Sequence, residues 1–371
     1  MPERRLGLSG ERGNPALRAL DRYFGIPVVA VGGALRRKRP RPHELRRIGV
    51  LNATSIGDTV LLSAVVRDIA AAHPQAQTIL FAGEAMAPVL RQLDGVTVVP
   101  IRISSPRSAV RTIRAQRLDA VLDFDPWPRI EPVYCLLSGA SFAAGFRSPG
   151  QHRHYAYDAS VEWLYSLHTL ENHRRLAEVL GVAASSQPEL RASGVVDDLP
   201  PDPYAVFHLW PTGVHSNLKE WSADRWRALA RALAERGYSI ALSGAPGDVE
   251  RTREFVAGTP DLDGRLLDLA GKYDLRELLD VLSGSRCVVS VNTGVMHLAA
   301  AVGAPTVALN GPTSERRWGP VGERTASVNS SLPSCGYLNF GWEYRGERTD
   351  CMLGITVDAV LEAVDRVASR D

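Results

Sequence analysis

The sequence predicts an α/β protein of two doubly wound domains, each a parallel sheet covered by helices. Short apolar strands alternate with helical segments over residues 48–124, and the pattern restarts over residues 204–309. This alternation is typical of βα units on a parallel sheet. A proline-rich stretch separates the two runs and indicates a linker. We therefore expect an N-terminal domain over residues 46–187, a linker over 188–203 and a C-terminal domain over 204–354.

The elements follow from buried strand patterns and from helical segments with end signals. In the N-terminal half we expect strands at residues 48–52, 78–82, 96–100 and 120–124, with helices from just after Asp58 to about Ala72 and at 87–93 and 108–116. In the C-terminal half we expect strands at 204–209, 239–243, 287–291 and 306–309, with helices at 223–236, 251–256, 275–282, 296–302 and 357–367. Ligands of such sheets bind beyond the carboxyl ends of the strands, so two facing domains predict a site in the cleft between them.

The composition is that of a globular protein, with 371 residues, 45% hydrophobic residues and a net charge of +2. This balance gives no support for nucleic-acid binding. The first 45 residues form a basic arm in which an apolar run, residues 26–35, precedes a polybasic segment at 36–47. A run of about ten residues is too short to span a bilayer. With Tyr23 and Phe24, residues 23–47 could instead contact an anionic membrane surface, or they could form a solvated or packed arm.

The expected location is the cytoplasm, with peripheral contact at the inner face of the membrane. No cleavage region follows the apolar run, so a signal peptide fits poorly. Four cysteines show no metal or disulfide framework, and Cys287 falls in a buried strand pattern. Cys335 and Cys351 could pair or bind a metal, but we expect reduced thiols in a cytoplasmic chain.

The most informative segment is residues 288–303, which indicates a buried strand, an Asn-Thr-Gly turn and a helix of small residues ended by Gly303. This order places the amides of Thr293 and Gly294 at a helix N-terminus. The helix dipole and the unpaired N–H groups there favour an anion, which makes a phosphate or diphosphate the expected ligand.

Three separated motifs together resemble the family 9 glycosyltransferases, typified by the ADP-heptose:lipopolysaccharide heptosyltransferases. The first is the strand, Ile-Gly-Asp loop and helix of residues 48–61; the second runs from residues 206–208 through Lys219-Glu220-Trp221 to Trp226; the third joins residues 292–299 to 303–306 and 311–313. The resemblance covers roughly residues 46–368 and implies the GT-B architecture, with two Rossmann-like domains facing across a cleft. A C-terminal helix, within residues 355–371, often packs back across the domain junction in such proteins.

On the acceptor side, the resemblance implies that Asp58 is the general base, in a loop with Ser55 and Gly57. A base must come within about 2.6–3.2 Å of the hydroxyl that it deprotonates. From spacing alone, Asp58 could instead be the N-cap of a helix starting near Thr59. Gly57 would serve either backbone approach to a ligand or a turn with positive φ. A nearby polar segment with Arg147, His152, Arg153 and His154 could line this half of the site, although a solvated loop is the simpler interpretation.

On the donor side, the resemblance implies that Lys219, Thr293, Gly294 and His297 hold the diphosphate, with Lys219 neutralising the leaving group. An ordinary exposed lysine and an interior histidine are the alternatives. Asn292 stands where the family usually has aspartate, which leaves the sugar contacts open. We interpret Trp221 as a packing residue that staples the following helix.

A second loop, with Gly244, Ala245 and Asp248, corresponds to the family's nucleoside contact, or it is a plain turn in which Asp248 caps a helix. No residue of this loop identifies the base.

These observations predict an inverting glycosyltransferase that moves a sugar, plausibly heptose, from a nucleotide diphosphate donor, plausibly ADP-linked, to a hydroxyl of a glycan, glycolipid or lipopolysaccharide-type acceptor. We expect no cofactor and no strict metal requirement, since the sequence shows no acidic metal motif and the helix dipole with Lys219 could replace a cation. A nucleotide-sugar epimerase or hydrolase, or a catalytically inactive nucleotide-binding protein, are the alternatives.

Overall fold

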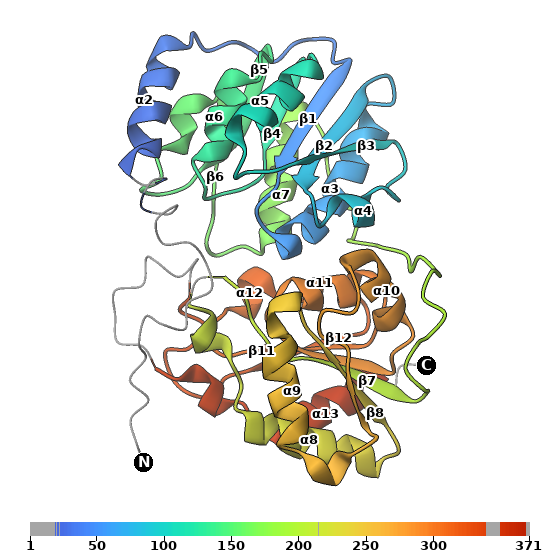
Figure 1. Cartoon of the computed structure of the whole chain (residues 1–371). Coiled ribbons are helices and arrows are strands. Elements are labelled where there is room, and N and C mark those ends of the chain that lie inside the picture. The colour runs from blue at the N-terminus through green and yellow to red at the C-terminus, as the bar shows by residue number, and fades with distance from the viewer. Residues whose placement is uncertain (1–18, 20, 22, 214, 339–348, 369–371) are drawn as a thin grey trace. The chain divides into compact units, whose positions relative to one another are not determined.

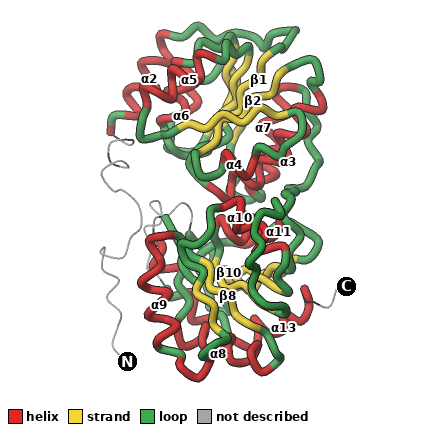
Figure 2. The backbone as a smooth tube through the Cα atoms, turned by 45° about the vertical axis from the view of Figure 1, so that its right-hand side comes forward, coloured by secondary structure: helices red, strands yellow, loops and turns green. Residues whose placement is uncertain are grey.

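The computed structural model describes residues 19, 21, 23–213, 215–338 and 349–368 of the chain. These fall into two compact units, Asn14–Glu189 and Leu190–Asp371 (Figure 1). Each unit has a six-stranded sheet in which the strand pairs are parallel. In both, helices lie on the two faces of the sheet (Figure 2). The predicted pair of doubly wound α/β domains is therefore confirmed.

The N-terminal unit has the strand order β3-β2-β1-β4-β5-β6. Its strands are β1 (Arg47–Asn52), β2 (Gln77–Gly83), β3 (Val96–Ile101), β4 (Ala120–Asp123), β5 (Phe142–Arg147) and β6 (Ala159–Glu162). Its helices are α2 (Gly25–Leu35), α3 (Ile56–Ala72), α4 (Ala87–Leu90), α5 (Pro106–Ala115), α6 (Ile130–Leu137) and α7 (Thr169–Ala177), with 3₁₀ turns η2 (Arg153–Ala156) and η3 (Glu178–Leu180). Helices α3 and α7 pack together, and α6 packs with α2 and α5.

The C-terminal unit has the strand order β12-β11-β10-β7-β8-β9. Its strands are β7 (Tyr204–His208), β8 (Ser239–Ser243), β9 (Leu266–Asp268), β10 (Cys287–Val291), β11 (Thr306–Asn310) and β12 (Thr325–Asn329). Its helices are α8 (Ala223–Glu235), α9 (Val249–Ala257), α10 (Leu275–Ser283), α11 (Gly294–Ala301), α12 (Glu315–Trp318) and α13 (Val357–Ala368), with 3₁₀ turns η4 (Ser216–Lys219), η5 (Pro246–Asp248), η6 (Pro260–Leu262) and η7 (Cys351–Gly354).

The predicted linker has no helix or strand, but residues 190–196 of it are fixed to the C-terminal unit. The backbone N–H groups of residues 193–196 all donate to the carboxylate of Asp280 on α10. Burial alone would raise the pKa of Asp280, but these donors bring it below its usual value. Leu190 adds a hydrogen bond to the carbonyl of Ala301.

Trp221 has the packing role predicted for it. Ser222 is the N-cap of α8, so Trp221 precedes the cap and Trp226 is the fourth helical residue. Their rings meet edge to face with centroids 5.1 Å apart, and both side chains are buried, which makes a hydrophobic staple. The C-terminal helix α13 packs on α8, β10, β11 and β12 of its own unit. It is part of this unit's core, with Val360 and Val364 buried there.

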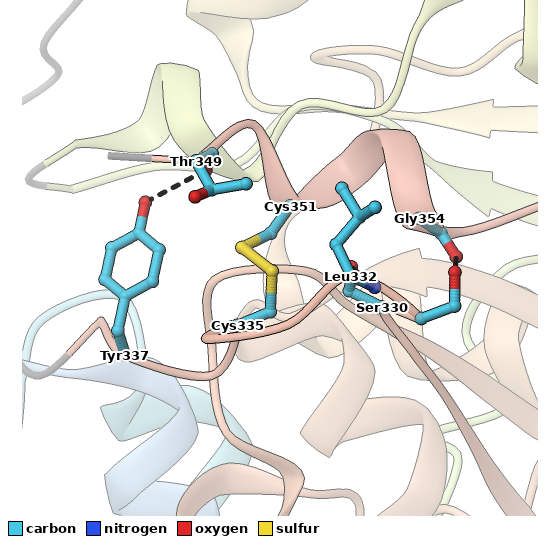
Figure 3. Close-up of a disulfide and its surroundings, with 8 residues drawn as sticks. Ser330, Leu332, Cys335, Tyr337, Thr349, Cys351 and Gly354 are labelled. Atoms are coloured by element: carbon cyan, nitrogen blue, oxygen red, sulfur yellow. Dashed lines mark hydrogen bonds between the residues drawn. A yellow bond between two sulfur atoms is a disulfide. The ribbon is translucent and has the colours of Figure 1, made fainter. Parts of the chain in front are cut away.

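The expectation of reduced thiols is wrong for one pair of cysteines. Cys335, after β12, forms a disulfide with Cys351 at the start of η7, and their Cα atoms lie 5.7 Å apart (Figure 3). Tyr337 donates to the carbonyl of Thr349 beside it, and Ser331 donates to the carbonyl of Gly354. The bridge therefore joins two segments that the chain places side by side. Cys135 and Cys287 are free and buried, as the strand pattern predicted for Cys287.

Within the described residues, no helix combines the length and the apolar character that crossing a bilayer requires. Residues 1–18 of the predicted arm lie outside the described part of the chain.

Candidate functional site

The predicted acceptor-side residues Ser55, Gly57 and Asp58 lie in the segment after β1, residues 53–58, which comprises a short loop and the first residues of α3 and is called the Asp58 loop below. The helix begins at Ile56, and Ser55 is its N-cap, because its hydroxyl accepts a hydrogen bond from the Asp58 backbone N–H at 3.3 Å. Asp58 is therefore the third helical residue, and the alternative that it caps the helix is wrong. Gly57 lies in the first helical turn and does not have positive φ.

Burial raises the pKa of Asp58 to about 6, and a hydrogen bond with Ser55 partly offsets this rise. A carboxyl group with a pKa near 6 is still mostly ionised at pH 7, and it is a stronger base than an ordinary aspartate. Asp58 thus combines a position at the carboxyl end of β1 with the proton affinity that a general base needs.

A buried network of charged groups lies under this loop. Asp123 ends β4, which is the neighbour of β1 in the sheet. Its carboxylate accepts hydrogen bonds from Arg153 at 2.6 Å and from the Tyr157 hydroxyl at 2.5 Å, and the Asp123 and Arg153 side chains are fully buried. The interpretation of Arg153 as part of a solvated loop is therefore wrong: η2 turns its guanidinium into the unit to pair with Asp123.

Two further carboxyl groups of this network hold the Asp58 loop in place. The Thr54 hydroxyl donates to the carboxylate of Asp125, and the Ala53 N–H donates to Glu131 at 3.0 Å. Burial raises the pKa of Asp125 to about 8, against the lowering effect of Arg153 and with added repulsion from Asp123 and Asp58. Burial also raises the pKa of Glu131 well above its usual value. At pH 7 Asp125 is therefore mainly protonated, whereas Asp58 is mostly ionised.

Sequence reasoning missed Asp125 and Glu131. A signal for Asp125 was present, because Asp123-Phe124-Asp125 ends a predicted strand that lies next to the first one in the doubly wound strand order. Glu131 carries no such signal, since it lies on α6 and reaches the loop only through the fold.

In the C-terminal unit, the predicted donor-side segments follow three neighbouring strands. Lys219 lies in η4 after β7, the Gly244 loop follows β8, and Thr293 follows β10, in the spatial order β10-β7-β8. Because carboxyl ends of parallel strands share one edge of a sheet, the fold brings these three segments together. His208, at the end of β7, hydrogen-bonds the hydroxyl of Ser243 at 3.0 Å and joins two of the strand ends.

Thr293 is the N-cap of α11 and Gly294 is its first residue, so the predicted strand–turn–helix segment is confirmed. The helix starts two residues earlier than expected. Its first N–H groups point out of the N-terminus without partners inside the helix, which is the arrangement that binds anions. His297 lies one turn after Thr293 and is only 4% exposed. Its burial matches the interior-histidine alternative, and a role toward the donor stays a prediction.

Asn292 has a clear local role. Its side-chain N–H₂ group donates to the Asn310 side-chain oxygen at 2.8 Å and to the Trp318 carbonyl at 2.9 Å. An amide satisfies both acceptors, whereas a carboxylate cannot donate to the Trp318 carbonyl. Asn292 therefore links the end of β10 to β11 and α12, and only its own oxygen is left for a ligand.

Lys219 is partly buried, and its ammonium group donates to the Thr212 carbonyl at 3.2 Å. Desolvation lowers the pKa of Lys219 to about 8. A partly desolvated ammonium group beside a single carbonyl is strongly stabilised by a bound anion, because the attraction between the two charges compensates for the lost hydration.

The Gly244 loop is closed by its own residues. The Asp248 carboxylate accepts a hydrogen bond from the Ala245 N–H at 3.0 Å, and Asp248 is buried. A Cβ at Gly244 would lie 3.0 Å from the Cβ of Asp248 and 3.1 Å from that of Ala270. Gly244 and Asp248 thus shape the turn, and any nucleoside contact would come from the backbone that they hold.

No group of three or more His, Cys, Asp or Glu side chains suited to a metal ion occurs among the residues that the structure describes.

Comparison with known proteins agrees with this arrangement. A family model for glycosyltransferase family 9 (heptosyltransferase) matches residues 107–336. Lipopolysaccharide heptosyltransferase 1 of Pseudomonas aeruginosa is 28% identical over 327 residues, covering 82% of this chain and 89% of that protein. The structure of Escherichia coli ADP-heptose lipopolysaccharide heptosyltransferase II matches with a TM-score of 0.69 at 20% identity, covering 87% of this chain and 98% of the other. That of E. coli heptosyltransferase WaaC with ADP gives 0.66 at 23% identity, covering 86% and 99%.

The two doubly wound units and the likeness to heptosyltransferase structures define the GT-B fold class. The chain belongs to glycosyltransferase family 9, since the family model spans more than half of its length.

Proposed function

We propose that this enzyme is an inverting glycosyltransferase that transfers heptose from an ADP-linked donor to a hydroxyl group of a lipopolysaccharide-type glycolipid. The support for heptose and for this acceptor class comes from the relatives named above, and the support for ADP comes from the WaaC structure with that nucleotide. A cytoplasmic location is part of the same proposal.

The observation that carries the proposal is the division of labour between the two sheets. At the strand ends of the N-terminal sheet lies Asp58, an ionised carboxylate of raised proton affinity. At the strand ends of the C-terminal sheet lie Lys219 and the N-terminus of α11, which are both sources of positive charge. A base for a hydroxyl and a holder for a diphosphate are the two groups that transfer from a nucleotide sugar requires.

The reaction would proceed by direct displacement. Asp58 accepts the proton of the acceptor hydroxyl while the oxygen of that hydroxyl forms the new bond to the anomeric carbon. The bond from that carbon to the diphosphate breaks, and the nucleoside diphosphate leaves with the electron pair. Lys219 and the amides at the start of α11 stabilise the charge that develops on it. Attack opposite the leaving group inverts the anomeric centre, and no divalent metal is expected to be required.

The test is calorimetric titration of the protein with a panel of nucleoside diphosphates and their sugars, ADP-heptose included. We expect one donor to bind, and we expect Lys219→Ala to weaken its binding about 10- to 100-fold, the range for a hydrogen bond to a charged group. Arg265→Ala is the matched control. This exposed cation directly precedes β9, so it lies at the amino ends of the strands, away from the carboxyl ends where the donor is expected to bind. Failure of every donor to bind, or equal weakening by both substitutions, contradicts the donor site. A freed or isomerised sugar without acceptor would identify a hydrolase or epimerase.

The pKa values predict a bell-shaped pH profile of kcat/KM. Asp58 must be ionised, so activity rises as the pH passes about 6. Lys219 must be protonated, so activity falls as the pH passes about 8. Lys219→Arg keeps its charge throughout this range and should move the falling limb to higher pH. An unchanged falling limb in that variant would assign it to another group.

A further inference from the structure

Helix α2 lies on the surface of the N-terminal unit and is fastened to it at both ends. Before the helix, Arg129 pairs with Asp21, its Nη1 lying 2.8 Å from Oδ2. After the helix, Arg36 pairs with the buried carboxylate of Asp158 at 2.6 Å. The predicted alternative of a packed arm is thus confirmed for these residues. Such clamps hold the helix in one orientation and fix which face it turns outward.

The inner face of α2 is built for close packing. Val29 is fully buried. A Cβ at Gly32 would lie 2.6 Å from Cδ1 of Leu136, and one at Gly33 would lie 2.2 Å from the carbonyl oxygen of Tyr155. The helix can therefore contact α6 and η2 this closely only because it has glycine at those positions.

The outer face of α2 is apolar and exposed. No residue from 23 to 35 carries a charged side chain. Phe24, Val28, Val31 and Leu35 recur at the spacing of one helical face, and they are 66%, 49%, 60% and 83% exposed. Tyr23, 72% exposed, extends this surface. A helix that is apolar all round is normally buried, so the open side of α2 requires an explanation.

Cationic side chains border this face. The segment after the helix contains four exposed basic residues, Arg37, Lys38, Arg39 and Arg41. The backbone N–H of Arg39 donates to Asp158 at 3.0 Å, the same carboxylate that pairs with Arg36, so the basic segment is held at the end of α2. Tyr155, in η2, is 44% exposed. The border of the apolar face is therefore positively charged and contains a further exposed aromatic ring.

We propose that the outer face of α2, with the basic border at residues 37–41, docks this enzyme on an anionic phospholipid membrane. The apolar residues would enter the boundary between headgroups and acyl chains, and the cations would contact anionic headgroups. The charge of the border selects a lipid surface over a second copy of the chain, whose equally basic border would be repelled. The inference goes beyond the proposed reaction and does not depend on it.

The test is co-sedimentation of the full chain with vesicles of phosphatidylcholine, alone or mixed with phosphatidylglycerol. We expect binding to the mixed vesicles that weakens as the salt concentration rises. Replacing three cations, Arg37→Gln/Lys38→Gln/Arg39→Gln, should weaken binding about 100-fold, at about 1 kcal/mol for each charge. Replacing the outer face, Val28→Ser/Val31→Ser/Leu35→Ser, should weaken binding to mixed vesicles at least about tenfold, because these side chains supply the buried apolar area.

The matched control is Arg253→Gln/Arg265→Gln/Arg276→Gln, which removes the same charge from exposed positions of the C-terminal unit. It should retain vesicle binding close to that of the wild type. Far-ultraviolet circular dichroism and thermal unfolding verify that all three variants are folded. Wild-type binding by both α2 variants, or equal loss in the control, overturns the proposal. Self-association in sedimentation velocity that the serine variant abolishes would assign the face to a second copy instead.

Discussion

Asp58→Asn is expected to lower kcat about a hundred- to ten-thousand-fold, the usual contribution of a positioned general base. Asparagine keeps the shape of the side chain and can still accept a hydrogen bond from Ser55, and the Ser55 cap is made to the backbone N–H of Asp58. The loop should therefore keep its conformation, while the group that accepts the proton is lost. Donor affinity should change little, because the proposed donor-binding residues belong to the C-terminal unit. Steady-state kinetics combined with donor titration measures both quantities.

Asp125→Asn provides the comparison for this substitution. The pKa of Asp125, at about 8, makes it mainly neutral at pH 7, so asparagine preserves its charge state. It should reduce kcat much less than Asp58→Asn does. Wild-type turnover in Asp58→Asn would remove Asp58 from the role of base. Equal losses in the two variants would instead show that the geometry of the loop, which Thr54 ties to Asp125, limits the reaction.

The sequence predicted the fold and the sites at strand ends because both depend on local patterns. The strands at 239–243 and 287–291 have the bounds expected from the sequence, since a buried parallel strand is a continuous run of apolar and small residues. The staple of Trp221 on Trp226 was predictable for the same reason, because it depends on spacing around one helix cap.

Features that depend on contacts distant in sequence were not predictable. Arg153 belongs to a segment whose sequence looks solvated. Its burial depends on β4, where the Asp123 carboxylate forms an ion pair with it. The amide of Asn292 is explained by the Trp318 carbonyl, which is 26 residues away. Helix α2 was recognisable in the sequence only as an apolar run. Three of its residues are glycines, so the sequence gives no sign of which side of the helix packs against the unit. In each case the local sequence does not show the distant residue whose contact determines the role.

Arg153→Met is expected to lower the free energy of unfolding of the N-terminal unit by about 3–5 kcal/mol, the usual cost of removing one partner from a buried ion pair. Methionine fills similar volume but leaves the Asp123 carboxylate buried and without a cation, with hydrogen bonds from the Tyr157 hydroxyl and the Asp125 N–H. Arg153 also donates to the carbonyls of Pro128 and Asp125, which would lose a partner. Urea denaturation, followed by circular dichroism at pH 7, measures the change.

Two further variants separate the charge effect from a general loss of packing. Arg102→Met removes an exposed pair with Glu84 in the same unit and should leave the midpoint nearly unchanged, because solvated pairs contribute little. Asp123→Asn/Arg153→Met removes both buried charges and should be more stable than Arg153→Met alone, since the uncompensated carboxylate is then gone. A double variant no more stable than the single one would mean that lost packing, not the unpaired charge, accounts for the cost. Since this network holds the Asp58 loop through Asp125 and Glu131, Arg153→Met should also reduce turnover at urea concentrations where the unit is still folded.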